Sequence, residues 1–407
     1  MTDPVAAHAR VPEHVPPELV YPFNQDLIPE FATRPFDVIA RVRREAPPVF
    51  YTPTFTRSPG GAWVVTRAHD TREGLQHPEI FTREDITHIS PFPRRLVPLE
   101  MDPPEHGKYR ALLAPLFSPK AIDAIDKDVA EISAGFLDKL APKGGCELME
   151  DFARPYPATV FMKMMGLPMD MQQEFVAWEK MTLNAVTLEG MLEGGNLVAS
   201  YLRELIAQRR KKPENDIITR LTQAEVDGKR VSDDIVEDMC FLLFIAGLDT
   251  VTAGQMHIWN YLASHPERKQ ELVADPTLIR DAVEEMLRYH SWIPFPRHVT
   301  EDTDLLGVGM KRGDRVMFMG AFASNDPEEF PEPDRIDFTR DANRHLCFAG
   351  GVHRCAGSHL ARREIRISLA QWLQRMPDFS LAPDQVVEYE TGMMFMPKAL
   401  ELRWTPA

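Results

Sequence analysis

Residues 232–264 form the segment that most constrains how this chain can fold. Ser232 is a favoured N-cap residue, and the helical pattern that follows it continues to Ser264. At 1.5 Å per residue the predicted helix is about 48 Å long, which exceeds the radius of a domain. Its middle, FLLFIAGL at residues 241–248, is apolar on every side. We therefore expect this helix to run through the core and not along the surface.

The rest of the pattern predicts shorter elements. Residues 104–276 are mainly helical, and Asp275-Pro276 predicts the start of a further helix. Residues 63–66 resemble a strand, short strands and turns follow Ser291, and a last helix is expected to begin at Cys355. No internal repeat, low-complexity linker or domain boundary is visible. The sequence predicts a mainly α protein with a minor β portion, folded as a single domain over residues 1–407.

Charge and composition exclude several classes of protein. A net charge of −15 disfavours binding to nucleic acid or anionic lipid. The longest apolar run, residues 240–248, is too short to span a bilayer, and the first residues do not resemble a signal peptide. The four cysteines lack the spacing of a disulfide framework or a zinc site. We expect a soluble, cytoplasmic protein with no nucleic-acid or membrane partner.

A glycine-rich turn, FAGGVHRCAG at residues 348–357, places Cys355 at the expected start of the last helix. There the helix dipole and the free backbone N–H groups favour thiolate over thiol. A thiolate is the form that an axial iron ligand requires. Taken alone, a cysteine beside a turn is more often a buried structural residue.

The spacing Phe-x-x-Gly-x-x-x-Cys-x-Gly resembles the haem-ligand loop of cytochromes P450. The resemblance covers nearly the whole chain, from residues 102–106 to the C-terminus, with the motifs in the family's order. It implies the cytochrome P450 fold, with the long helix over one buried haem b whose iron is bound by Cys355. Ala349 stands where the family usually has glycine, and we expect Gly350 to supply the backbone freedom.

The middle of the long helix breaks the rules of helix design. In the run AGLDT, residues 246–250, Gly247 costs about 1 kcal/mol relative to alanine, and Asp249 lies among apolar neighbours. Small residues leave room for a ligand, and the hydroxyl of Thr250 can open the helix hydrogen bond. The alternative is a helix kink with a salt-bridged aspartate. The run GLDTV is similar to the camphor-hydroxylating branch, where the matching acid–alcohol pair supplies protons for oxygen activation.

A third motif is Glu285-x-x-Arg288, an (i, i+3) pair that many surface helices contain. It lies 70 residues before Cys355, and Arg335 follows at the position where the family's second arginine completes a buried Glu-Arg-Arg network. The resemblance implies a structural role for these three residues, which would hold the cysteine loop.

Further residues are candidate cofactor and substrate contacts. The resemblance implies that four residues hold the haem propionates: His106, Arg110, Arg297 and His353. Each of them, taken alone, is more often a surface charge. The predicted substrate pocket is apolar, although any one of its residues can instead be ordinary core. It comprises Ile86, Phe92, Leu96, Val97, Leu242, Ile245, Ala246, Ile293, Met394 and Phe395.

The resemblance implies a monooxygenase that uses O₂ and a small or medium hydrophobic substrate. The loop at residues 83–98 lacks the tyrosine of camphor-hydroxylating relatives, so a terpenoid other than camphor, a norisoprenoid or an aromatic compound is expected, with His88 or Arg94 as polar anchor. No flavin or iron–sulfur motif occurs, so electrons come from a ferredoxin and its NAD(P)H-dependent reductase. A basic cluster would dock the ferredoxin: Lys108, Arg344, Arg354, Arg362 and Arg363. The alternatives are a peroxide-driven haem peroxygenase and a non-catalytic haem-binding protein.

Overall fold

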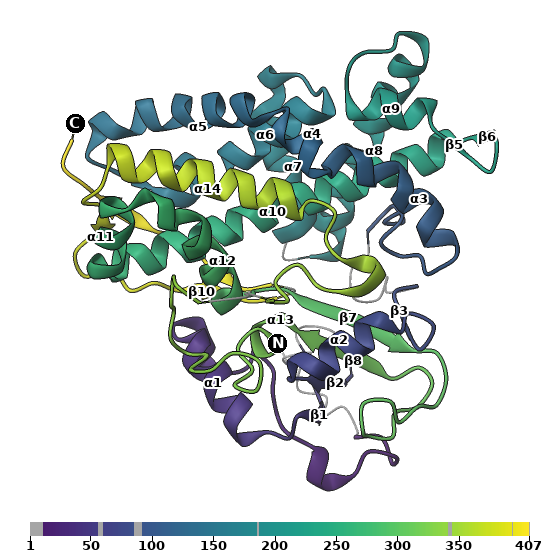
Figure 1. The fold of residues 1–407 in the computed structure, drawn as a ribbon. Helices are drawn as coiled ribbons and strands as arrows, with labels where there is room; N and C mark the ends of the chain where they lie inside the picture. The colour runs from purple at the N-terminus through teal and green to yellow at the C-terminus, as the bar shows by residue number, and fades with distance from the viewer. Residues whose placement is uncertain are drawn as a thin grey trace. The chain divides into compact units, whose positions relative to one another are not determined.

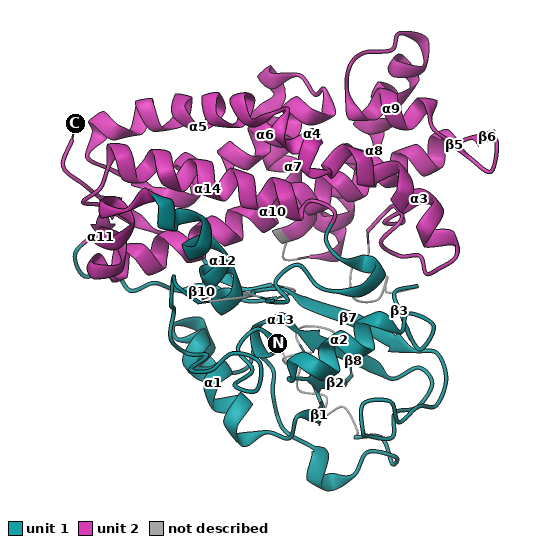
Figure 2. Cartoon of the chain, in the orientation of Figure 1, with its two compact units in different colours: residues 1–86, 277–355, 383–399 teal, residues 87–276, 356–382, 400–407 magenta. Residues whose placement is uncertain are grey.

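The computed structural model describes residues 11–55, 60–84, 92–184, 187–340, 344–392 and 394–406. The chain divides into two compact units, each assembled from separate stretches of sequence (Figure 2). Unit 1 contains residues 1–86, 277–355 and 383–399, and unit 2 contains residues 87–276, 356–382 and 400–407. Because each unit takes its residues from several parts of the chain, this division does not test the expectation of a single domain, which stays a prediction.

Unit 1 contains the larger sheet of the protein. Its five strands lie in the order β1-β2-β8-β7-β3, with β2 and β8 parallel and the other neighbours antiparallel. Its helices are α1 (Pro35–Glu45), α2 (Ala68–Gln76), α12 (Ile279–His290) and α13 (Gly320–Ala323). Its strands are β1 (Val49–Thr52), β2 (Ala62–Val65), β3 (Phe81–Thr82), β7 (Pro294–Val299), β8 (Arg315–Met319), β10 (Tyr389–Glu390) and β11 (Met396–Pro397).

The sheet of unit 1 is covered by an apolar core that the sequence supplies from β-branched and aromatic residues. Trp63, Phe81 and Phe318 are fully buried in it. Helix α2 comes close to β8 because residue 74 is glycine: a Cβ atom there would collide with the ring of Phe318. The predicted strand at residues 63–66 is confirmed as β2, shifted by one residue.

Unit 2 contains most of the helices. They are α3 (Glu105–Leu113), α4 (Pro119–Asp123), α5 (Asp126–Leu140), α6 (Pro155–Met165), α7 (Gln172–Asn184), α8 (Leu188–Lys211), α9 (Ile217–Gln223), α10 (Asp233–Ser264), α11 (Pro266–Ala274) and α14 (Ser358–Arg375). Its strands are β4 (Gly145–Glu147), β5 (Glu225–Val226), β6 (Lys229–Arg230), β9 (Ser380–Leu381) and β12 (Glu401–Arg403). The prediction of a mainly α protein with a minor β portion is confirmed.

Helix α10 is the predicted long helix, with both ends where the sequence placed them. The hydroxyl of its N-cap residue Ser232 accepts a hydrogen bond from the N–H of Ile235 at 3.4 Å. The helix packs against α6, α7, α8 and α14 (Figure 1). Its C-terminal half contributes Trp259 to an aromatic cluster with Phe152 and Trp372, whose ring centroids lie 5.4–6.3 Å apart. Burial from several sides explains why the sequence of α10 is apolar all round.

Two predicted helix starts were displaced. The helix expected at Pro276 begins there only as a 3₁₀ turn, Pro276–Leu278, which leads into α12 at Ile279. The last helix begins at Ser358, three residues after Cys355, because the glycine-rich turn continues through Gly357. Within the described residues, no helix is both long and apolar enough to cross a membrane.

Candidate functional site

The predicted site residues divide between the two units. Cys355, Arg297 and His353 belong to unit 1, whereas the Asp249–Thr250 pair and His106 belong to unit 2. The geometry of each group is therefore built up within its own unit.

The cysteine loop is held by its own backbone. The N–H of Cys355 donates to the carbonyl oxygen of Phe348 at 3.0 Å, and the N–H of Arg354 donates to that of Gly351 at 3.1 Å. Cys355 is exposed, whereas Cys146, Cys240 and Cys347 are buried. An exposed thiol on a fixed loop is suited to binding a metal, and the three buried cysteines are not.

The residue of this loop that adopts the left-handed backbone conformation is not the one that we expected. Ala349 has a φ of +57°, whereas the φ of Gly350 is −141°, so Ala349 itself adopts the conformation that favours glycine. The expectation that Gly350 supplies the backbone freedom is therefore wrong. Gly351 does require glycine: its φ is +63°, and a Cβ atom would collide with the carbonyl oxygen of Leu75.

The strain at Ala349 gives a stability prediction. An alanine in the left-handed conformation costs roughly 1–2 kcal/mol, and glycine removes this strain. Glycine also has more conformational entropy in the unfolded state, which offsets part of the gain. Ala349→Gly should therefore raise the free energy of unfolding by about 0.5–1 kcal/mol. Denaturant unfolding of the haem-loaded protein measures this. Gly350→Ala is the matched control, because a Cβ atom there makes only ordinary contacts of 3.7 Å or more. Destabilisation by Ala349→Gly would contradict the strain argument.

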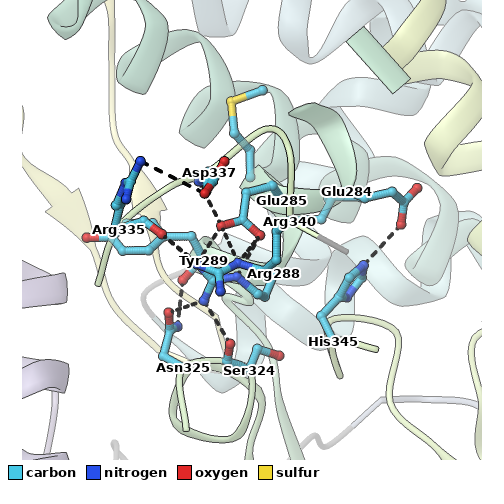
Figure 3. A network of polar contacts seen from close by, with 12 residues as sticks. Glu284, Glu285, Arg288, Tyr289, Ser324, Asn325, Arg335, Asp337, Arg340 and His345 are labelled. Atoms are coloured by element: carbon cyan, nitrogen blue, oxygen red, sulfur yellow. Dashed lines mark hydrogen bonds and ion pairs between the residues drawn. The ribbon is translucent and has the colours of Figure 1, made fainter. Parts of the chain in front are cut away.

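Glu285 lies at the centre of a buried polar network next to the loop (Figure 3). Arg288 donates to both carboxylate oxygens of Glu285 at 2.8 Å, and both side chains are essentially inaccessible to solvent. The second arginine is Arg340, whose Nε lies 3.0 and 3.1 Å from the two oxygens. The side chain of Arg335 is 64% exposed and lies near Glu332 and Asp337 instead, so the prediction for Arg335 is wrong. Its backbone carbonyl accepts hydrogen bonds from Arg288 and Arg340.

Two side chains connect this network to the cysteine loop. Arg288 donates to the carbonyl of Ser324 at 3.0 Å, and the hydroxyl of Ser324 accepts from the N–H of Leu346 at 2.9 Å. His345 accepts from the N–H of Cys347 through Nδ1 at 3.2 Å, so Nε2 carries the proton and donates to Glu284 at 3.1 Å. These contacts hold the start of the cysteine loop. They are the kind of contact that a structural role of Glu285 and Arg288 in holding this loop requires. Arg340 and His345 were not found in the sequence, because neither stands in a recognisable motif.

The middle of α10 has an exposed side within an otherwise buried helix. Ala246 is exposed and Thr250 is half-buried, whereas Asp249 is 2% exposed. The hydroxyl of Thr250 donates to the carbonyl of Ala246 at 2.9 Å. The space at Gly247 is taken by the ring of Phe161 from α6, 2.8 Å from where a Cβ atom would lie. Gly247 therefore admits a protein side chain and not the ligand that we expected there.

Asp249 belongs to a buried cluster of charged residues. The alternative considered from the sequence was a helix kink stabilised by a salt bridge of this aspartate. Its Oδ1 is buried without a hydrogen-bond partner among the described residues. Burial raises the pKa of Asp249, and Arg154 opposes this shift. Burial, together with the charge of Asp249, raises the pKa of Glu179 to about 8. Sequence reasoning missed Glu179, although it occupies a position of the buried stripe of α7 between Phe175 and Thr182.

The four predicted propionate contacts lie in two places. His106 is buried on α3, and burial, followed by the charge of Arg110, lowers its pKa while Asp102 opposes the shift. His106 therefore offers a neutral N–H donor beside a permanent cation. In unit 1, Arg297 is buried on β7 and its guanidinium donates to the carbonyl of Pro296 at 2.8 Å. His353 is buried in the 3₁₀ turn that precedes Cys355. Their role as propionate contacts stays a prediction.

The predicted pocket residues differ in their surroundings. Leu96, Val97 and Leu242 are buried, and Phe92 packs edge-on against Phe241 with ring centroids 6.0 Å apart. Ile245, Ile293 and Met394 are half-buried, and Ile86 and His88 lie outside the described residues.

Two further side chains of this region are occupied within the protein. The ring of Phe395 contacts Phe31 and Phe36, as a core residue does. Arg94 is ion-paired with Asp238 at 2.6 Å and donates to the carbonyl of Asp234, which leaves it little capacity as a substrate anchor.

Three cations of the predicted docking cluster are ion-paired. Arg344 contacts Glu329 at 3.0 Å, Arg363 contacts Asp123 at 2.6 Å, and Lys108 contacts Asp227 at 2.7 Å. Within the described part of the chain the cluster is therefore less positive than the sequence indicates.

The donor set fits a haem bound through a cysteine. The exposed cysteine lies on a loop fixed by backbone hydrogen bonds, and α10 has a half-buried hydroxyl on its exposed side, directly after a buried acid in the chain. A cysteine can supply the thiolate ligand of a haem iron, and an acid–alcohol pair is of the kind that moves protons.

Comparisons with known proteins agree with this donor set. The family model of Cytochrome P450 matches residues 189–403. Probable cytochrome P450 127A1 of Sinorhizobium fredii is 36% identical over 405 residues, 97% of each chain. The mycinamicin IV hydroxylase/epoxidase of Micromonospora griseorubida is 33% identical and covers 84% of this chain and 89% of its own. The crystal structure of CYP101J2 has a TM-score of 0.86 at 29% identity and covers 97% of this chain and 99% of that one. The chain therefore belongs to the cytochrome P450 family of haem-b-dependent monooxygenases.

Proposed function

We propose that this protein inserts one oxygen atom of O₂ into a C–H bond of a small or medium apolar substrate. The reaction is R–H + O₂ + 2 e⁻ + 2 H⁺ → R–OH + H₂O. The observation that carries the proposal is the Asp249–Thr250 pair, in which a half-buried hydroxyl on the exposed side of the middle of α10 follows directly after a buried acid. A peroxygenase or a non-catalytic haem protein has no need of such a pair.

Five predicted residues would hold the cofactor. Cys355 would bind the iron through its thiolate sulfur, and His106, Arg110, Arg297 and His353 would donate to the propionates. When bound, haem supplies the activation of dioxygen. The protein supplies the fixed thiolate, the orientation of the substrate and the delivery of protons.

Proton delivery would begin at Asp249. Because burial raises the pKa of its carboxyl, the acid keeps a proton at higher pH than an exposed aspartate does. The hydroxyl of Thr250 donates to the carbonyl of Ala246, so its oxygen can accept a hydrogen bond from the reactant side. Asp249 would relay protons, and Thr250 would accept a hydrogen bond from the group that receives them, as general acid catalysis requires.

Thr250→Ala should uncouple electron consumption from product formation. Without the hydroxyl, protons are no longer directed to the productive position, so NADH should still be consumed while peroxide accumulates and product falls by about 10-fold or more. The ratio of product to NADH, measured with a ferredoxin and its reductase, checks this. Thr250→Ser keeps the hydroxyl and should stay coupled. A tightly coupled Thr250→Ala enzyme would remove Thr250 from the mechanism.

The electron donor would be a ferredoxin with its NAD(P)H-dependent reductase, because the sequence has no flavin or iron–sulfur motif of its own. Arg354 is the exposed cation of the predicted docking cluster nearest in sequence to the cysteine ligand. We expect an acidic ferredoxin surface to bind there, so that turnover falls as salt is added.

The substrate would be a terpenoid, a norisoprenoid or an aromatic compound. The predicted pocket residues are apolar, and the loop that would carry a ketone-binding tyrosine has none. A Soret titration of the ferric protein with these three classes tests this choice. A shift to high spin would identify a compound that binds beside the haem. No shift with any class, in a protein whose reduced CO adduct has the thiolate signature, would overturn the small-substrate proposal.

A further inference from the structure

We propose that the paired hydroxyl groups of Ser291 and Ser324 position Ile293 for contact with the substrate and tie its segment to the start of the cysteine loop. This inference rests on the proposed function, because it takes Ile293 as a residue of the substrate pocket. Ser291 and Ser324 would be positioning residues that act through Ile293 and through the loop, and not residues that touch the substrate. All of these residues belong to unit 1.

Ser291 ends α12 in a conformation that serine rarely adopts. Its φ of +31° and ψ of +55° lie in the left-handed region, and its N–H donates to the carbonyl of Leu287 at 3.1 Å. The chain then enters β7 at Pro294, and the residue before a proline is restricted mainly to extended conformations. Because the backbone of Ile293 has little freedom of its own, the turn at Ser291 decides where its half-buried side chain lies.

Hydrogen bonds of the Ser291 side chain hold this unfavourable turn. Its hydroxyl lies 3.2 Å from the carbonyl oxygen of Leu287 and 2.9 Å from the hydroxyl of Ser324, and both serines are essentially inaccessible to solvent. The hydroxyl of Ser324 also accepts a hydrogen bond from the N–H of Leu346 at 2.9 Å. When Ser291 donates to Leu287 and Ser324 donates to Ser291, each hydroxyl both donates and accepts. One chain of hydrogen bonds then runs from the start of the cysteine loop to the end of α12.

The backbone around Ser324 is fixed independently of this chain. Its N–H donates to the carbonyl of Gly320 at 2.9 Å, and its own carbonyl accepts from Arg288 at 3.0 Å (Figure 3). Gly320 also lets the chain pass close to the Ile293 segment: a Cβ atom there would lie 2.9 Å from the carbonyl oxygen of Ile293 and 3.2 Å from that of Ser291. Ser324 is therefore a fixed point that can hold both the Ile293 segment and the cysteine loop.

The two ends of this chain belong to different parts of the predicted site. Leu346 begins the loop that leads to Cys355, and Ile293 is a predicted pocket residue. Removing the hydroxyl of Ser291 releases only the Ile293 segment, since Ser324 keeps its hydrogen bond to Leu346. Removing the hydroxyl of Ser324 releases both ends and leaves the buried N–H of Leu346 without this partner. The two serines therefore make different predictions.

Two azole ligands of the haem iron test the role of Ser291 without turnover. Imidazole needs only the iron position, whereas 4-phenylimidazole adds a phenyl group that must fit the pocket. In Ser291→Ala, and in Ser291→Gly, which adopts the left-handed turn without strain, the affinity for 4-phenylimidazole should fall by about 3- to 10-fold while that for imidazole changes by less than about 2-fold. Ser368→Ala removes a fully buried hydroxyl of α14 and should leave both affinities unchanged.

Ser324→Ala tests the connection to the cysteine loop. It should weaken 4-phenylimidazole binding to the same extent and also convert part of the reduced CO adduct to a form without the thiolate signature. The double variant of Ser291 and Ser324 should bind 4-phenylimidazole no more weakly than Ser324→Ala alone, because both changes break one chain.

The same measurements separate this inference from the proposed function. An equal loss of both azoles in the Ser291 variants, unchanged 4-phenylimidazole binding, an intact thiolate signature in Ser324→Ala, or additive effects in the double variant would overturn the inference and leave the proposed function standing. An unmodified protein whose reduced CO adduct lacks the thiolate signature would overturn the proposed function, and the inference with it.

Discussion

The free energy of unfolding should fall by about 3–5 kcal/mol when Glu285 is replaced by glutamine. The carboxylate accepts two hydrogen bonds from Arg288, which is fully buried, and one or two from Arg340. Removing its charge leaves a buried guanidinium without its counter-charge, which is among the most destabilising single changes in a protein. Denaturant unfolding followed by circular dichroism measures the loss, and haem absorbance reports whether the cysteine loop is retained.

Two arginine variants keep this prediction testable if the glutamine variant does not fold. Arg340→Gln should lower the free energy of unfolding by about 1.5–3 kcal/mol, because it removes charged hydrogen bonds. Arg335→Gln should change it by less than about 0.5 kcal/mol, since the Arg335 side chain is exposed. Equal effects of the two changes would contradict the role described for Arg340. A larger effect at Arg335 would show that Arg335 is the second arginine of the network, as the sequence predicted.

Replacing Asp249 with asparagine should slow product formation by about 100-fold without weakening substrate binding. Asparagine has nearly the same shape but holds no transferable proton. The turnover rate with a saturating ferredoxin measures the loss, and the spin-shift titration measures binding. Asp234→Asn, an exposed change in the first turn of the same helix, is the matched control. Unchanged turnover in the Asp249 variant would exclude it from proton delivery.

Product formation by the unmodified enzyme should depend on pH in the direction that loss of the Asp249 proton predicts. Because burial raises the pKa of Asp249, its acid form persists above the ordinary range of an aspartate and is lost as pH rises through the raised value. Product formation should therefore decline on the alkaline side. The Asp249→Asn enzyme should be slow at every pH and should lack this decline.

The sequence predicts the framework of the protein because the relevant signals are local. Helix α10 has a Ser232 cap and an apolar middle, and both ends fall where the pattern places them. The ion pair of Glu285 and Arg288 also follows from local spacing, since residues three apart share a helix face. Cys355 stands out as the predicted iron ligand because its glycine-rich loop has the fixed spacing of residue types found in the family's haem-ligand loop.

The errors concern contacts that depend on tertiary packing. Arg335 and Arg340 lie five residues apart in one irregular segment, and only the folded chain decides which side chain turns inward. Ala349 takes the left-handed conformation because its neighbours fix it, although Gly350 next to it has the greater intrinsic freedom. The space beside Gly247 belongs to Phe161 on another helix. Nothing in the local pattern of Gly247 distinguishes a ligand from a packed ring.

The most direct test of the account is the fate of isotopically labelled dioxygen in a reaction driven by NADH, a ferredoxin and its reductase. The substrate would be the compound that gives the largest shift to high spin. We predict one labelled oxygen atom in each product molecule and the other in water. Unlabelled product, or equal product formation from peroxide without NADH, would contradict the claim that this protein is a dioxygen-dependent monooxygenase.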